Sequence, residues 1–370
     1  MSKPPRILVV APMHSHPPDQ GNAARLAAFG AALRARGAWV ELLYFGLEGL
    51  SPAREAAMRA AWDGFHYLPP LAPQRQSFPC HWGLDDWCPA SLGEAVAALQ
   101  ARHAFHAVVV NYVWLSRVLE AVSGPLRVLD THDLFGDRHM VARRDGLLPS
   151  WYFTSTADEA RGLARADVVL GIQQEESAEL QRRGAARVMT VGHPPGLRFL
   201  HQAPGAAVQA RFGMLASGNP WNLGAVAALD SALADQSLDW LLAGGILRAP
   251  GLRLRSAPRR LAVAEAAEFY AAVDCVLNPM QGGTGLKIKT VEALDFGAPV
   301  LGTRDAFAGL GAEHPAHQAA DAAGVVALMR EWAASAAFRA EVALAGRLLA
   351  LRYAAEVESQ YDALMALLEE

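Results

Sequence analysis

A glycine-rich turn followed by two lysines is the feature of this 370-residue chain most able to do chemistry. The turn, residues 279–285 (PMQGGTG), follows an apolar run at 275–278 (CVLN) that is typical of a buried strand. Lys287 and Lys289 come next, and the chain has only one other lysine, Lys3. A glycine-rich turn that opens a helix presents unpaired backbone N–H groups, and these favour a phosphate. The pattern predicts an anion site at the end of a strand.

The two lysines are expected to differ in role. On a helix, Gly285, Lys289 and Glu292 share one face, whereas Lys287 projects about 160° away from Lys289. We therefore expect one lysine to serve the phosphate and the other not. The alternative is an ordinary connecting loop with solvated lysines. The segment matches neither GxxxxGK[ST] nor GxGxxG.

A second polar group follows a short apolar run at residues 127–129. It reads DTHD over residues 130–133, and Arg138 comes soon after. Ligands of open parallel sheets collect at the carboxyl ends of strands, so His132 is the candidate catalytic residue. The alternative is a hydrogen-bonded loop histidine. Histidine and carboxylates can also bind divalent cations, but we expect no metal site.

A Pro- and Gly-containing loop, residues 12–22, follows the first predicted strand. Gly21 and Asn22 can offer N–H groups to a substrate, with Arg25 next on a helix, although a plain connecting loop fits nearly as well. Two aromatic segments, 78–88 (FPCHWGLDDWC) and 151–153 (WYF), either face an acceptor or a membrane surface or pack a loop. The spacing of cysteine and histidine in 78–88 does not match a zinc site.

These segments belong to a repeating order of strand, loop and helix, which normally builds a parallel sheet. A Gly- and Pro-rich linker at 191–204 divides the chain, and residues 336–370 are almost continuously helical. Glu175 and Glu176 begin a predicted helix, where the dipole favours acids. Strands are predicted at 6–11, 39–45, 107–110, 127–129 and 167–172 before the linker, and at 211–216, 239–243, 275–278 and 299–302 after it.

Length and composition fit two globular domains. A domain averages roughly 150 residues, and 52% hydrophobic with 19% charged residues allows large cores. The net charge of −4 lacks the basic excess that nucleic-acid binding requires. Three cysteines without a CxxC, and no signal-like N-terminus, predict a cytoplasmic protein with free thiols. No apolar run reaches the roughly 18–20 residues of a spanning helix, which leaves peripheral membrane contact open.

Residues 278–303 (NPMQGGTGLKIKTVEALDFGAPVLGT) resemble the donor-site signature of group 1 glycosyltransferases of the GT-B fold. The resemblance covers nearly the whole chain and is least distinctive in the first 100 residues. It extends to 213–229 (GMLASGNPWNLGAVAAL), 269–279 (FYAAVDCVLNP), 130–133 (DTHD) and 166–176 (ADVVLGIQQEE).

The resemblance implies an α/β fold with two Rossmann-like, doubly wound domains facing across a cleft. It places an acceptor-side domain at 1–195, with residues 352–370 packing back on it, and a donor domain at 196–351. It also implies a retaining hexosyltransferase without a cofactor, using a UDP-, GDP- or dTDP-sugar as co-substrate. The acceptor would be a hydroxyl of a glycan or lipid-linked sugar. The setting would be bacterial surface polysaccharide, glycolipid or glycoconjugate synthesis at the inner face of the membrane.

The resemblance further assigns residues. Glu292 would accept hydrogen bonds from the nucleotide ribose, and His132 would lie beside the transferring sugar. Two departures stand out: Thr284 replaces a glutamate common in the family, and its basic pair is missing near 217–222. The implied donor site is Ser217, Gly283, Thr284, Gly285, Leu286, Lys287, Lys289 and Glu292; the acceptor or cleft residues are Gly21, Asn22, Arg25, Asp133 and Arg138. A nucleotide-sugar epimerase and a non-catalytic sugar-nucleotide-binding subunit are the alternatives.

Overall fold

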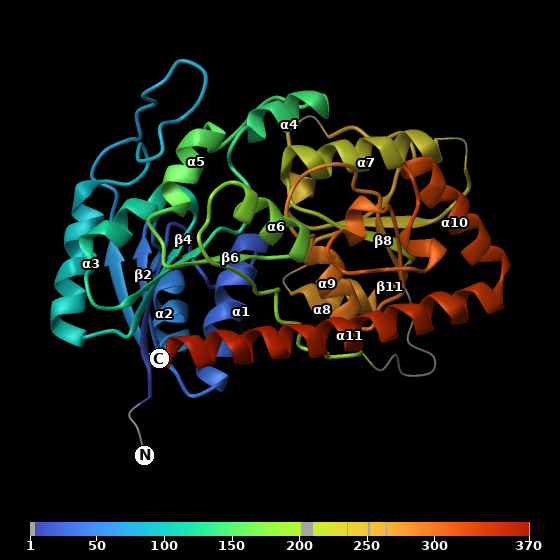
Figure 1. The fold of residues 1–370 in the computed structure, drawn as a ribbon. Helices are drawn as coiled ribbons and strands as arrows, with labels where there is room; N and C mark the ends of the chain where they lie inside the picture. The colour runs from blue at the N-terminus through green and yellow to red at the C-terminus, as the bar shows by residue number, and fades with distance from the viewer. Residues whose placement is uncertain (1–3, 201–209, 235, 251, 264, 370) are drawn as a thin grey trace. The chain divides into compact units, whose positions relative to one another are not determined.

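The computed structural model describes residues 4–200, 210–234, 236–250, 252–263 and 265–369 (Figure 1). The chain divides into two compact units, called here unit 1 (Met1–Pro194 with Val357–Glu370) and unit 2 (Pro195–Glu356). The sequence placed the boundary after residue 195 and the return to the first domain at about residue 352. Residues 201–204 of the predicted linker lie outside the described residues, as does Ala264, the first residue of a helix that the sequence predicts over 264–272.

Unit 1 contains, over its described residues, a seven-stranded parallel sheet in the order β3-β2-β1-β4-β5-β6-β7. Its central strands are apolar and buried because helices cover both faces of such a sheet. The order reverses between β1 and β4, which is the position where ligands of doubly wound sheets bind. The strands are β1 Arg6–Ala11, β2 Trp39–Phe45, β3 Gly64–Leu68, β4 Ala107–Asn111, β5 Leu126–Asp130, β6 Val168–Gly171 and β7 Val188–Thr190.

The helices of unit 1 alternate with these strands, as the sequence predicted. Helix α1 buries Leu26, Phe29 and Leu33, a spacing that places one apolar stripe on the core. The helices are α1 Gly21–Ala35, α2 Pro52–Ala61, α3 Ala90–His103, α4 Arg138–Arg144, α5 Thr156–Leu163, α6 Gln174–Arg182 and the 3₁₀ helix η1 Val113–Ala121.

Unit 2 has a five-stranded parallel sheet in the order β10-β9-β8-β11-β12 within the part of the chain described. Its order reverses between β8 and β11. Trp240, Phe212 and Met329 are buried in its core. The strands are β8 Ala210–Leu215, β9 Trp240–Ala243, β10 Arg259–Leu261, β11 Val273–Asn278 and β12 Val300–Gly302, and the helices α7 Pro220–Leu233, α8 Ala266–Ala271, α9 Ile288–Asp295, α10 Ala322–Ala334, η2 Gly245–Arg248, η3 Asp305–Phe307 and η4 Pro315–His317.

Helix α11, Ala336–Leu368, ends the chain (Figure 1), and its residues from Val357 onward belong to unit 1. There, Tyr361 is buried with its ring 5.9 Å from that of Phe29 on α1. Arg36 forms ion pairs with Glu358 and Asp362. Among the described residues, no helix combines the length and apolarity needed to cross a membrane. Cys80, Cys88 and Cys275 are free thiols.

Candidate functional site

The glycine turn of unit 2 leaves β11 at Asn278 through a left-handed backbone. Gly282, Gly283 and Gly285 have φ of 68°, 74° and 71°, values that residues with a side chain rarely adopt. Helix α9 begins directly after, at Ile288. At these three positions no Cβ stands between the backbone and an approaching anion.

Side-chain bonds fix both ends of this turn. Asn278 donates from Nδ2 to Thr290 Oγ1 at 2.8 Å and accepts from the Met280 N–H at 3.3 Å. Asp305 accepts from the Gly282 N–H at 2.7 Å. Thr303 donates from Oγ1 to the Met280 carbonyl. The turn is thus tied to β11, α9 and the segment that follows β12.

The two lysines have different partners. Lys287 Nζ donates to the carbonyls of Thr284 at 3.2 Å and Gly285 at 3.0 Å. Lys289 Nζ pairs with Glu292 Oε2 at 2.6 Å. The helical angle expected between the lysines does not hold, because Lys287 precedes α9 with ψ of 88°. Lys287 belongs to the turn and Lys289 to the helix.

Thr284 and Leu286 complete the predicted segment. Thr284 Oγ1 is buried and has no hydrogen-bond partner among the described residues. Leu286 is buried beneath the turn. At position 284, where a glutamate was expected from the resemblance, the chain therefore supplies a small neutral hydroxyl and no charge.

The loop after β8 adjoins the glycine turn. Asn219 caps α7 by accepting from the Asn222 N–H at 2.8 Å, and Asn222 Nδ2 donates to Ser217 Oγ at 2.9 Å. A Cβ placed on Gly283 would lie 3.4 Å from the Trp221 ring. Since β8 and β11 are the strands between which the order reverses, Ser217 and the glycine turn meet where a ligand site is expected.

In unit 1, His132 lies just beyond the end of β5. It has φ of 60° and is buried. Its Nε2 donates to Asn111 Oδ1 at 2.6 Å, and Asn111 Nδ2 donates to the Val10 carbonyl at 2.9 Å. Burial lowers the pKa of His132 to about 4, against the opposing effect of Asp130. The imidazole is therefore neutral at physiological pH.

Tyr112, which the sequence analysis did not identify, holds the other side of His132. The two rings stack at 4.5 Å, and Tyr112 also stacks on Trp114 at 4.1 Å. Its hydroxyl bonds Asn22, the second residue of α1, which begins at Gly21. Tyr112 directly follows the last residue of β4, and this position at a strand end could have identified it from the sequence.

Arg25 and Arg138 hold the two aspartates of the DTHD segment. Arg25 is buried and donates to the Gly192 carbonyl at 2.6 Å, with Asp130 at 3.3 Å. Arg138 pairs with Asp133 at 2.9 Å. The side chain of Arg25 is 1% exposed, so it orients Asp130 instead of facing solvent as a ligand contact would.

Glu176, predicted to lie at a helix start where the dipole favours acids, does lie in the first turn of α6 and is buried there. Thr131 Oγ1 lies 3.5 Å from its Oε1. Burial, together with Asp133 and Asp130, raises the pKa of Glu176 to about 8. At neutral pH it is mostly protonated. Its neighbour Glu175 is exposed.

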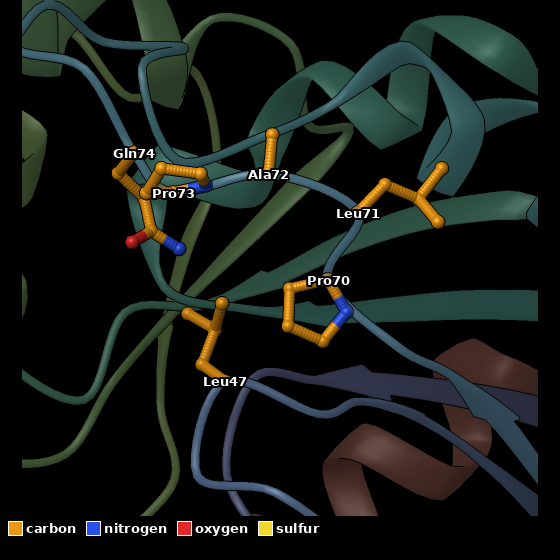
Figure 2. Close-up of a pocket in the computed structure, with 6 residues that line it drawn as sticks. All are labelled: Leu47, Pro70, Leu71, Ala72, Pro73 and Gln74. Carbon is orange, nitrogen blue, oxygen red and sulfur yellow. The ribbon is translucent and has the colours of Figure 1, made fainter.

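Two other features of unit 1 lie outside this group. A shallow pocket of about 320 Å³ lies between Leu47, after β2, and residues 70–74, after β3 (Figure 2).

Glu41, His66 and His103 lie close enough together to hold a metal ion, and among the described residues no other such group was found. Arg6 already occupies that cluster, with its Nη2 3.0 Å from His103 Nδ1.

No protein-family model and no curated protein matches the chain. Solved structures do match over the full length. Sucrose-phosphate synthase from Thermosynechococcus elongatus has a TM-score of 0.74 at 16% identity, over 98% of this chain and 99% of that one. The chain has the GT-B fold. Anabaena HepE in complex with UDP-glucose (TM-score 0.69, 16% identity, 98% and 99% covered) and a Rickettsia africae glycosyltransferase (0.66, 9%, 100% and 100%) share it.

The GT-B fold confirms the predicted class, two Rossmann-like domains with doubly wound sheets. In this fold, the glycine turn lies at the point of strand-order reversal of unit 2, and Tyr112, directly after β4, lies at that of unit 1. His132 follows the neighbouring strand β5. Within unit 1, β4 and β5 supply Asn111 and Asp130.

Glu176→Gln tests the buried acid. A pKa raised from 4.5 to about 8 means that the folded protein keeps a proton that the unfolded chain loses between these pH values. Glu176 therefore favours folding at pH 5, and that contribution is lost as pH rises through 8. We expect the melting temperature of wild type relative to Glu176→Gln to fall from pH 5 to pH 8. Glu175→Gln, an exposed neighbour, is the control, and a difference that does not change with pH would contradict the assignment.

Proposed function

We propose that this GT-B protein is a group 1 glycosyltransferase that moves a sugar from a nucleotide diphosphate sugar to a hydroxyl acceptor. The observation that carries the proposal is the left-handed glycine turn beside Lys287 at the strand-order reversal of unit 2. It lies within residues 278–303, the segment that resembles the family's donor signature. The structure of HepE with UDP-glucose makes UDP-glucose the first donor to try.

In the proposed donor site, backbone N–H groups near Gly285 to Lys287 bind the diphosphate. Lys287 adds positive charge next to the turn, which stabilises the diphosphate most when negative charge grows on the leaving oxygen. Glu292 binds the ribose hydroxyls, because a carboxylate presents acceptors to a vicinal diol. Lys289 holds one of its carboxylate oxygens in place.

In unit 1, the proposed role of His132 follows from its tautomer. Because Nε2 donates to Asn111 and the ring is neutral, Nδ1 carries the lone pair and accepts a hydrogen bond from a sugar hydroxyl. Asn22 and Gly21, at the start of α1, and the Asp133–Arg138 pair belong to the proposed acceptor side.

The finer parts of the proposal come from the resemblance. They are retention at the anomeric carbon and a glycan or lipid-linked acceptor in bacterial surface polysaccharide, glycolipid or glycoconjugate synthesis. In this proposal the protein contacts the inner face of the membrane peripherally. The nucleotide sugar is a co-substrate, with neither a cofactor nor a metal ion.

The proposal is tested by thermal-shift screening against UDP-, GDP- and dTDP-sugars, followed by an assay of nucleotide release with acceptors. A ligand that binds only the folded state raises the melting temperature. Conversion of the donor sugar without an acceptor would identify an epimerase instead. Tight donor binding with no turnover across a broad acceptor panel would favour a non-catalytic subunit.

Lys287→Ala and Lys289→Ala should weaken UDP binding unequally. Lys287 contacts the turn itself, and a hydrogen bond to a charged group contributes about 1.5–3 kcal/mol, so its loss should cost about tenfold or more. Lys289→Ala should cost less, through a loosened Glu292. Isothermal titration with UDP, against uridine as the phosphate-free control, measures both. If both variants bind UDP with wild-type affinity, the diphosphate does not bind at this turn.

Glu292→Gln keeps the shape of the side chain but replaces one acceptor oxygen with a donor. We expect UDP affinity to fall, while the affinity for 2′,3′-dideoxy-UDP, which lacks the ribose diol, should be nearly the same in variant and wild type. Equal losses for both ligands would place the ribose elsewhere and leave Glu292 with only its structural pairing to Lys289.

His132→Ala should lower kcat with little change in UDP affinity, because the residue belongs to unit 1 and the donor nucleotide to unit 2. The expected loss is about 2 to 4 kcal/mol of transition-state stabilisation, the order of magnitude for removing one hydrogen bond at a reacting centre. His132→Asn serves as a second variant, since asparagine tolerates the left-handed backbone better. His139→Ala, on the neighbouring helix α4, is the histidine control. Normal turnover in both folded His132 variants would end the catalytic assignment.

A further inference from the structure

Trp151 is an exposed aromatic residue in a strained backbone conformation. It follows the chain segment after α4, is 46% exposed and has φ of 64°. A bulky residue in the left-handed region is an outlier, and such strain persists only where the surrounding structure enforces it. An exposed indole held this way calls for an explanation beyond packing.

The surrounding structure fixes the orientation of this ring. Trp82 Nε1 donates to the Trp151 carbonyl at 3.2 Å, which ties the 82–87 segment to it. Four other rings meet it nearly edge-on: Trp114 at 4.9 Å and 84°, Tyr112 at 5.5 Å and 88°, Phe135 at 5.8 Å and 71°, and Trp87 at 6.3 Å and 82°. A ring positioned in advance loses little conformational entropy on binding a ligand.

Trp151 is one ring away from His132. Tyr112 stacks on His132 at 4.5 Å and meets Trp151 at 5.5 Å. The Tyr112 hydroxyl also reaches Asn22 at the start of α1. The exposed indole therefore adjoins the residues of unit 1 that the proposed function assigns to the acceptor side.

We propose that Trp151 is the stacking platform for a saccharide acceptor, so that the hydroxyl acceptor is a sugar ring. This rests on the proposed function and names the acceptor class for its unit 1 site. One face of a pyranose carries mainly C–H groups, which match the negative face of an indole, while its hydroxyls stay in water or bind polar groups. Tryptophan is suited to this because its large surface combines with a polar N–H.

A lipid surface is the competing occupant, because Met140 and Leu148 in the same region are 55% and 87% exposed. Trp151 differs from these aliphatic side chains in two ways. Its ring is locked edge-on against four others, and it adjoins His132 through Tyr112. Insertion into a membrane requires neither feature, whereas stacking on a sugar beside a reacting centre uses both.

The experiment compares wild type, Trp151→Ala and Trp151→Phe with Trp39→Ala. Trp39 is a matched control, 44% exposed but at the start of β2. Saturation-transfer NMR with methyl glucosides, galactosides and mannosides, in the presence of UDP, measures saccharide binding. Where transfer to a saccharide is found, KM for that acceptor is measured as well. Trp151→Phe keeps an aromatic ring and guards against a variant that fails to fold.

Wild type should bind at least one saccharide, and Trp151→Ala should weaken that binding about 2- to 10-fold, the usual worth of an aromatic contact. The saccharide affinity of Trp151→Phe should lie between those of wild type and Trp151→Ala. UDP affinity should be unchanged in all variants, and Trp39→Ala should bind the saccharide as wild type does. Equal saccharide affinity in wild type and Trp151→Ala, or no saccharide binding to wild type, would overturn the proposal. The proposal would also be overturned if Trp151→Ala lost binding to vesicles of anionic phospholipid but kept its saccharide affinity. Trp151-dependent saccharide binding without any sugar transfer would keep this proposal and end the proposed function instead.

Discussion

The chain must turn left-handed as it leaves β4, β5 and β11, and both candidate sites depend on how it does so. After β11 the turn uses glycines, which have no steric penalty there. After β4 and β5 it uses Tyr112 and His132, with φ of 72° and 60°. The first solution leaves the backbone of the turn without side chains at three positions, so an anion can approach it closely. The second places large side chains at the strand ends, where they stack on one another.

Charge balance in unit 1 follows from this crowding. Asp130, Asp133 and Glu176 approach one another near the strand ends, and Arg25 is the buried cation acting on this group. Like charges in a poorly solvated place cannot all ionise, so the acid that has no ion-pair partner among the described residues keeps its proton. Glu176 is that acid. His132 is neutral because burial lowers its pKa. A neutral imidazole can donate one hydrogen bond and accept another.

Apolar runs predicted the fold well because strands buried on both faces need them. The strands at 6–11 and 39–45 occur as predicted, and the alternation with helices predicted doubly wound sheets. Three strands were missed: β3, in which only Phe65 is buried, and β7 and β10, because three residues carry little pattern. The helical angle between Lys287 and Lys289 was wrong because α9 begins only at Ile288. A helix start depends on local hydrogen bonds, which the lysine and glycine pattern does not specify.

The two candidate sites also differ in how far a sequence can reveal them. In unit 2 the turn, Lys287 and Glu292 lie within residues 279–292, so one continuous segment specifies the geometry. In unit 1, Arg25 meets Asp130 at a separation of 105 positions, and Asn111 meets His132 across 21. Trp151 reaches the same cluster from a later loop. Side chains brought together from separate strand ends leave no continuous sequence motif. A substitution at any one of these distant positions therefore changes what the assembled site can bind. The proposed function gives a reason for this difference: every donor presents the same diphosphate, which a local motif in unit 2 can bind, whereas acceptors differ and would be recognised by the dispersed residues of unit 1.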